Sequence, residues 1–164
     1  MKNKIIKITL CMLSVLCFMA CEYFAKPALP SFDIVVLKDT LSIYNTASIK
    51  KGTPVVFFYF SPECDHCQFQ TDSILTNMDS LRNVKFYFLS NDSMNLVKEF
   101  SKSRNMDKYD NVLVGIDMKG YYLKHYTPKS TPSVAIFDKK QQLKYMLDGG
   151  TDIHTLIRLV NNVN

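Results

Sequence analysis

The sequence predicts an α/β domain in which a central mixed β-sheet is flanked by helices on both faces. In the middle of the chain, apolar runs typical of strands alternate with segments of helical periodicity, which favours parallel strands joined through helices. Near the end, two strand-like segments are separated only by a turn, which adds an antiparallel pair. The chain has 164 residues, enough for one such domain with a sizeable core.

Residues 1–20 are predicted to be a signal peptide of the lipoprotein type. Three lysines precede an apolar stretch, residues 8–20, that is too short to span a membrane comfortably. The stretch ends at Ala20-Cys21, and residues 18–21 resemble a bacterial lipoprotein signal, in which the cysteine becomes lipidated. Cys21 is therefore the predicted lipidation site and membrane attachment. An uncleaved signal anchor is the alternative.

Removal of this segment changes both the charge and the cysteine content of the chain. The formal net charge falls from +5 to about +2, because three lysines and no acidic residue are lost. The remaining chain has no basic patch, so no nucleic-acid partner is predicted. Besides Cys21, only Cys64 and Cys67 remain. A single close pair does not fit a scaffold held by several disulfides, so we expect the pair to be used chemically.

The first half of the domain is predicted to contain a hairpin, a buried strand and a helix. Residues 21–31 form a proline-containing tether, and the domain covers residues 32–164. Residues 32–38 and 41–45 predict the N-terminal hairpin. The apolar run 55–60, bounded by turn-forming residues, predicts a strand buried on both faces. Residues 64–81 lack proline and glycine and keep roughly helical apolar spacing that includes Phe69, so Cys64 is expected where the strand ends and the helix begins.

The second half continues the alternation. Residues 84–89 predict a strand, 93–104 an amphipathic helix, 111–116 a short strand, and 118–126 an irregular or short helical segment. Thr131-Pro132 leads into a strand at 134–138, which pairs with 143–147 as a hairpin. Thr151 is the predicted N-cap of a last helix. The apolar residues of that helix recur at helical spacing: Ile153, Leu156, Ile157 and Val160.

The segment Cys64-Asp65-His66-Cys67 carries the predicted chemistry. Two thiols separated by two residues on the first turn of a helix can close into a disulfide with little strain. The N–H groups and partial positive charge of a helix N-terminus favour a thiolate at Cys64. Cys64 is therefore the predicted attacking group, and Cys67 resolves the mixed disulfide. A charged His66 would stabilise the thiolate, whereas Glu63 and Asp65 would disfavour it.

The same residues do not favour a metal or haem site. Zinc would need a second pair of ligands, but His125 and His154 are isolated and no second C-x-x-C exists. Haem attachment would need a histidine directly after the second cysteine, where Gln68 stands. We therefore expect no cofactor other than a redox-active disulfide between Cys64 and Cys67. A purely structural disulfide is the alternative.

Two segments resemble the active site of thioredoxin-like proteins. VVFFYFSPECDHC, residues 55–67, is similar to their strand followed by C-x-x-C, and Thr131-Pro132 before VAIFD is similar to the threonine and cis-proline that face the active site. The resemblance covers roughly residues 32–164 and implies a thioredoxin-like fold. It also implies that the proline loop presents its backbone to an extended segment of the partner. An ordinary proline at the start of a strand is the alternative for Pro132.

A narrower resemblance concerns the spacing of the two segments. A strand and a helix at about residues 84–104 separate Cys64 from Pro132 more widely than in minimal thioredoxins. This insertion, together with the export signal, resembles the membrane-tethered TlpA/ResA-like reductases of bacterial envelopes. The resemblance implies a lipid-anchored reductase that faces the periplasm. Its implied partners are exported proteins with disulfides, as substrates, and a membrane thiol that donates electrons.

Several positions depart from the family pattern. Phe60 and Glu63 stand where tryptophans are common, and Phe58 stands where cytosolic thioredoxins have a buried acid that assists proton transfer. No clear replacement acid is visible, although Glu63 could serve. His66 is similar to the residue of oxidising relatives, so the direction of electron flow stays open.

Two other functions also stay open. A peroxiredoxin-like peroxidase has the same strand order, and Ser61 and Cys64 fit its pattern, but the proline expected near Phe57 is missing. A non-catalytic binding module, in which the cysteines only brace the helix or hold a metal transiently, is the third possibility.

Overall fold

The computed structural model describes residues 28–37 and 41–163. The predicted signal segment, Cys21 and most of the predicted tether lie outside these residues. The last tether residues lie against the domain: Ala28 forms a bridge with Gln142, and the Leu29 amide donates to the Gln141 carbonyl at 2.8 Å. Within the described residues, no helix has the length and apolar character needed to cross a bilayer.

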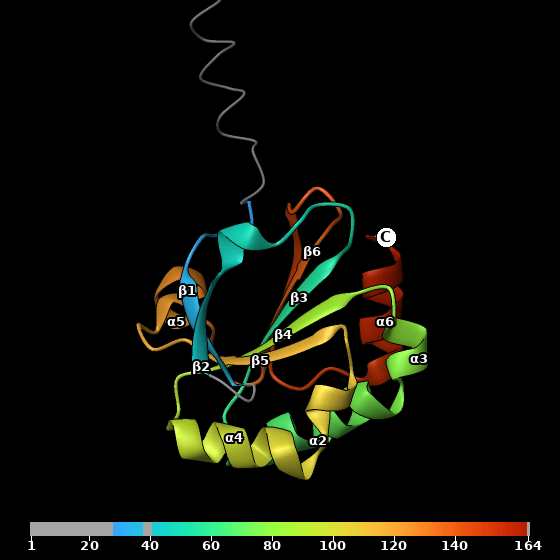
Figure 1. Cartoon of the computed structure of the whole chain (residues 1–164). Helices are drawn as coiled ribbons and strands as arrows, with labels where there is room; N and C mark the ends of the chain where they lie inside the picture. Colours follow the sequence, from blue (N-terminus) through green and yellow to red (C-terminus); the bar gives the residue numbers. More distant parts are fainter. Residues whose placement is uncertain (1–27, 38–40, 164) are drawn as a thin grey trace, which may run out of the picture.

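Seven strands of the described part form one mixed sheet with helices on both faces, which confirms the predicted α/β fold (Figure 1). The strand order is β2-β1-β5-β4-β3-β6-β7. Strands β3, β4 and β5 are parallel, and the other pairings are antiparallel. The strands are β1 (Asp33–Leu37), β2 (Leu41–Asn45), β3 (Val55–Tyr59), β4 (Lys85–Ser90), β5 (Val112–Ile116), β6 (Ser133–Phe137) and β7 (Leu143–Asp148).

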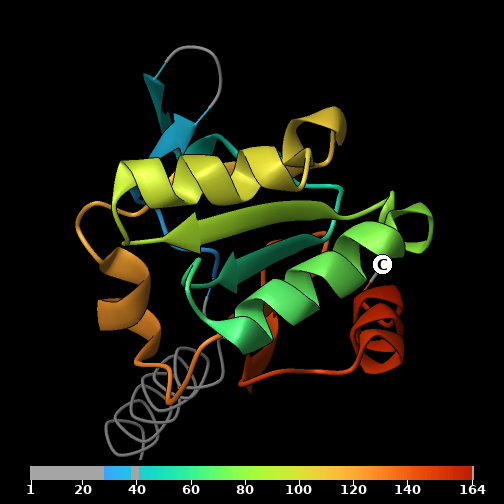
Figure 2. The ribbon, with the colours of Figure 1, turned by 90° about the horizontal axis from the view of Figure 1, so that it is seen from below.

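The helices divide between the two faces of the sheet. Helices α2, α3, α4 and α6 cover one face (Figures 1 and 2). The short α5 and residues 29–32, which precede β1, cover the other. The helices are α2 (Asp65–Thr76), α3 (Met78–Leu81), α4 (Met94–Ser103), α5 (Tyr121–Tyr126) and α6 (Ile153–Asn161), with short 3-10 turns at Thr46–Ser48 and Met106–Lys108.

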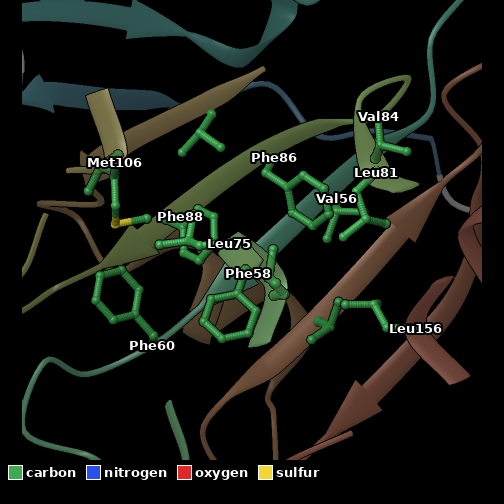
Figure 3. Close-up of a cluster of buried hydrophobic side chains, with 14 of the residues drawn as sticks. Val56, Phe58, Phe60, Leu75, Leu81, Val84, Phe86, Phe88, Met106 and Leu156 are labelled. Carbon is green, nitrogen blue, oxygen red and sulfur yellow. The ribbon is translucent and has the colours of Figure 1, made fainter. Parts of the chain in front are cut away.

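Strand β3 supplies side chains to both layers of the core. Val56 and Phe58 point into the layer beneath α2, α4 and α6, where Figure 3 shows them among other apolar side chains. Val55, Phe57 and Tyr59 point into the opposite layer, and every residue of the strand is buried. A strand with no solvent-facing side reads as a continuous apolar run, which is why the sequence identified it.

The predicted insertion is an integral part of the sheet. It forms β4 and α4, and β4 lies between β3 and β5. Because β3, β4 and β5 are parallel, their carboxyl ends lie at one edge of the sheet, where the antiparallel β6 begins. This edge receives the loops that follow β3, β4 and β5 and the loop that precedes β6.

Three local predictions need correction. The helix predicted over residues 64–81 breaks at Asn77, whose backbone leaves the helical region (φ −104°, ψ 20°) while its side chain donates to the Ser73 carbonyl at 2.9 Å. Phe69 does not belong to the buried stripe, because it is 75% exposed. The N-cap of α6 is Asp152 and not Thr151. The Asp152 carboxylate accepts from two amides of the first turn, whereas the Thr151 amide donates to the Gln70 side chain.

Candidate active site

Cys64 is the N-cap residue of α2. The chain leaves β3 at Tyr59, turns through Ser61 and Pro62, and enters the helix with Cys64 in an extended conformation (φ −87°, ψ 114°). The Cys64 sulfur accepts a hydrogen bond from the Cys67 amide at 3.3 Å. Serine, threonine or aspartate usually fills this position, so the sulfur takes the place of a capping oxygen. This environment favours a thiolate, because the first amides of a helix lack backbone acceptors.

Cys67 lies one turn further along, inside the core. Its exposed fraction is 0%, and it packs in the same apolar layer as Val56 and Phe58. Cys64 is partly exposed, and both residues are free thiols. One sulfur is thus within reach of an incoming molecule and the other is shielded from it.

The loop before β6 reaches the same sulfur from across the site. The peptide bond between Thr131 and Pro132 is cis. The Thr131 carbonyl oxygen and the Thr131 hydroxyl each lie 3.9 Å from the Cys64 sulfur, so the hydroxyl can donate to a thiolate and the carbonyl can accept from a thiol. The Gly149 amide donates to the Pro132 carbonyl at 2.8 Å and ties the loop to the end of β7. Segments 67 residues apart therefore meet at Cys64.

The two thiols have opposite acidities. Partial burial alone would raise the pKa of Cys64, but hydrogen bonds from the thiol and amide of Cys67, the Thr131 hydroxyl and the His66 amide outweigh it, and the pKa is lowered. Burial, followed by the loss of the hydrogen bond to Cys64, raises the pKa of Cys67 to about 12. Cys64 is therefore the thiol that ionises first, and Cys67 retains its proton.

Three side chains near Cys64 in the sequence are predicted to tune the thiolate. Glu63, Asp65 and His66 are exposed. Among the described residues, none of their side chains makes a hydrogen bond or ion pair with Cys64. The contribution of His66 to the thiolate comes from its backbone amide. Sequence reasoning missed Gln68, whose side-chain amide donates to the Pro62 carbonyl at 2.8 Å and braces the turn before Cys64.

Phe58 stands at the position where the resemblance would place a buried acid. Its ring lies 4.9 Å from the ring of Phe88 and 6.2 Å from that of Phe60, and its exposed fraction is 0% (Figure 3). Glu63, the replacement acid considered from the sequence, is exposed. The core beside Cys67 is therefore apolar at this position, which is consistent with the high pKa of the Cys67 thiol.

The described residues contain no group of three or more histidine, cysteine or acidic side chains that could hold a metal ion. His125 is exposed and stacks on Tyr121 with ring centroids 5.3 Å apart, and His154 is exposed on α6. Neither histidine is among the groups that influence the two thiols.

Comparison with known proteins identifies the fold. No protein-family model matches the sequence, and no curated protein matches it. Among solved structures, MTB DsbF is 20% identical with a TM-score of 0.69, covering 85% of this chain and all (100%) of that one. A secreted Mycobacterium tuberculosis disulfide oxidoreductase, homologous to Escherichia coli DsbE, is 17% identical with a TM-score of 0.66, covering 80% of this chain and 95% of that one.

Peroxiredoxins are similar to the same degree. The reduced 2-Cys peroxiredoxin of Plasmodium vivax is 13% identical with a TM-score of 0.66, covering 84% of this chain and 80% of that one. The chain therefore has the thioredoxin-like fold, which confirms the fold implied by its C-x-x-C and Thr-Pro segments. The fold is shared by disulfide oxidoreductases and peroxiredoxins, so the choice between these activities depends on the site.

Proposed function

We propose that this thioredoxin-fold chain is a thiol–disulfide oxidoreductase that uses Cys64 and Cys67 to reduce disulfides. One observation carries the proposal: a partly exposed sulfur with a lowered pKa caps a helix, and a second, buried thiol lies on the first turn behind it. A structural disulfide or a bracing pair does not need this difference in acidity. Dithiol exchange does, because one sulfur attacks first and the other must wait.

The proposed reaction has two steps. The Cys64 thiolate bonds to one sulfur of a substrate disulfide, the substrate S–S bond breaks, and the other sulfur leaves as a thiolate that takes up a proton. Cys67 then loses its proton and bonds to the Cys64 sulfur, which breaks the mixed disulfide and releases the second substrate thiol. The substrate gains two electrons and Cys64–Cys67 becomes a disulfide. A thiol donor must return these electrons before the next cycle.

Thr131 has two roles in this scheme. Its hydroxyl donates to the Cys64 thiolate before attack, and the adjacent carbonyl accepts from the protonated thiol. Thr131 is partly exposed beside the buried Pro132, and the resemblance implies that the backbone of this loop binds an extended substrate segment. Glu63, Asp65 and His66 are exposed and close to Cys64 in the sequence, so they would adjust the preference of the site for substrates.

We also propose that the domain works in the bacterial cell envelope, attached through lipid on Cys21 and facing the periplasm. The support is the lipoprotein-type segment at residues 1–20, which ends at Ala20-Cys21. The proposed substrates are exported proteins with disulfides, and the proposed electron donor is a membrane thiol. The secreted mycobacterial oxidoreductase shares this fold.

Capture of mixed disulfides tests the function. Cys67→Ser should accumulate partner proteins joined to Cys64, because the resolving thiol is missing while the attacking thiol remains. The adducts should disappear on reduction and should be absent from the matched Cys64→Ser variant. A Cys67→Ser protein that captures nothing, together with a wild-type protein that neither reduces insulin nor exchanges with glutathione, would favour a non-catalytic binding module.

A thiol peroxidase is the second candidate, supported by the similarity to the 2-Cys peroxiredoxin structure. In that case the Cys64 thiolate would attack a peroxide oxygen, the O–O bond would break, and the leaving oxygen would take up a proton to give water or an alcohol. The Cys67 thiol would then bond to the sulfur of the Cys64 sulfenic acid and release water, leaving a disulfide. Peroxide consumption coupled to thiol oxidation distinguishes the two candidates. Fast consumption that depends on Cys64, with no insulin reduction, would select the peroxidase.

A further inference from the structure

Tyr122 contacts both strands that carry the site. It lies on α5, and its exposed fraction is 0%. Its ring stacks on Tyr59 of β3, with centroids 4.9 Å apart and planes 9° from parallel. Its hydroxyl is hydrogen-bonded to the Ser133 hydroxyl of β6 at 3.1 Å. A single side chain from α5 therefore contacts the end of β3, which leads to Cys64, and the start of β6, which follows Thr131.

The two residues that the Tyr122 side chain contacts, Tyr59 and Ser133, lie at the strand ends next to the site. Tyr59 and Ser133 are paired residues in the β3–β6 ladder. Tyr59 is the last residue of β3 before the turn to Cys64, and Ser133 is the first residue of β6, one residue after Pro132. A shift of Ser133 would therefore change the position of Thr131 relative to the Cys64 sulfur, and the 3.9 Å contacts from Thr131 depend on that position.

The hydroxyl pair is buried within an apolar layer. Ser133 has an exposed fraction of 0%, and its neighbours belong to the apolar layer around Tyr59 and Phe137. Replacing both partners of a buried hydrogen bond by apolar groups is often nearly neutral for stability. The pair therefore contributes a defined position more than a gain in stability. Burial raises the pKa of Tyr122, which keeps the phenol protonated.

The Tyr122 backbone amide is hydrogen-bonded, as is the Tyr122 hydroxyl. Its amide donates to the Asp117 carboxylate at 2.7 Å, and Asp117 is buried at the end of β5. The Asp117 amide in turn donates to the Ser90 carbonyl at the end of β4. Helix α5 is thus anchored to β4 and β5 while the Tyr122 side chain holds β3 and β6.

We propose that Tyr122 is a positioning residue for Cys64, acting through Ser133 and the Thr131 hydroxyl. This inference rests on the proposed function only in treating Cys64 as the reactive thiol. Loss of the Tyr122 hydroxyl removes one of the contacts that hold the start of β6, while the ladder pair with Tyr59 remains, so the Thr131 hydroxyl spends less time near the thiolate. Cys64 then becomes a weaker acid and reacts more slowly at neutral pH.

The test uses the reduced full-length chain with Tyr122→Phe and, separately, Ser133→Ala. The measurement is the rate at which iodoacetamide modifies the peptide that contains Cys64, followed by mass spectrometry across a range of pH. Each variant should react about threefold more slowly at neutral pH, a fraction of the effect of one complete hydrogen bond, with its pH profile moved upward. If Tyr122→Phe does not fold, Ser133→Ala still supplies the result.

Tyr87→Phe is the matched control. Tyr87 is buried in the same apolar layer, and its hydroxyl pairs with that of Tyr44 at 3.3 Å on strands that do not lead to Thr131. Its loss should leave the Cys64 profile unchanged. A general loosening of the layer would instead slow Cys64 equally in Tyr87→Phe and would overturn the inference.

A second background tests the route through Thr131. In a Thr131→Val protein the hydroxyl that donates to the Cys64 thiolate is gone, so adding Tyr122→Phe should cause no further change in the Cys64 rate. An equal threefold loss in that background, or unchanged rates in both single variants, would refute the proposed role. Because iodoacetamide needs no physiological substrate, this result is independent of whether Cys67→Ser captures partners.

Discussion

Thr131→Val should make Cys64 a weaker acid without disturbing the fold. The substitution keeps the shape of the side chain and removes only the hydroxyl that lies 3.9 Å from the sulfur. A hydrogen bond to a charged group contributes about 1.5–3 kcal/mol, and the length of this contact and the partial exposure of Cys64 reduce the value to about 1 kcal/mol. At a pH below the pKa of Cys64, this corresponds to about a fivefold smaller thiolate fraction.

The assay follows alkylation of the Cys64 peptide as a function of pH in the reduced protein. Cys67 does not interfere near neutral pH, because burial raises its pKa to about 12. Thr131→Val should move the profile to higher pH, whereas Thr131→Ser, which retains the hydroxyl, should leave it close to the wild type. An unmoved profile in Thr131→Val, or a profile moved to lower pH, would refute the idea that the loop stabilises the thiolate.

Two further predictions concern stability. The folded state holds the Cys67 proton more tightly than the unfolded state, because burial raises the pKa of this thiol from 9.0 to about 12. The protonated Cys67 thiol therefore contributes fully to the stability of the reduced protein below pH 9, and this contribution is lost as the pH rises toward 12. Urea unfolding of Cys67→Ser should therefore lose stability less steeply over this range than the reduced wild type, and equal slopes would contradict the assignment. Asp152→Ala should lower the urea midpoint of unfolding, because two amides of α6 lose their acceptor, while Thr151→Ala should lower it much less. The reverse order of the two variants would restore Thr151 as the cap.

Sequence reasoning succeeded where the signal is local. Strand β3 is a continuous apolar run because both of its faces are buried, and that pattern needs no knowledge of the rest of the fold. The same holds for the junction of strand and helix at Cys64. The sequence pattern did not predict the end of α2 at Asn77, because no proline or glycine marks it. It also placed Phe69 in the buried stripe, because the apolar character of this residue does not indicate which face of α2 is exposed.

The site divides in the same way. The cysteine pair is visible in the spacing of two residues, whereas its approach to Thr131 came from resemblance to a family and not from periodicity. The contacts of Tyr122 with Tyr59 and Ser133 left no sequence signal, because they join segments of three separate elements. Likewise, the pairing of β1 with β5 joins distant parts of the chain, and the hairpin pattern of the N-terminus could not predict it.

The redox equilibrium of the full-length protein with a glutathione or dithiothreitol buffer measures whether Cys64 and Cys67 exchange electrons as a pair. We expect a reversible two-electron transition between free thiols and a Cys64–Cys67 disulfide at about −270 mV, the potential of a reductase such as thioredoxin. The transition should be absent from Cys64→Ser. A transition at about −120 mV would contradict the proposed direction of electron flow. A protein that forms no Cys64–Cys67 disulfide at any potential would contradict the redox function itself.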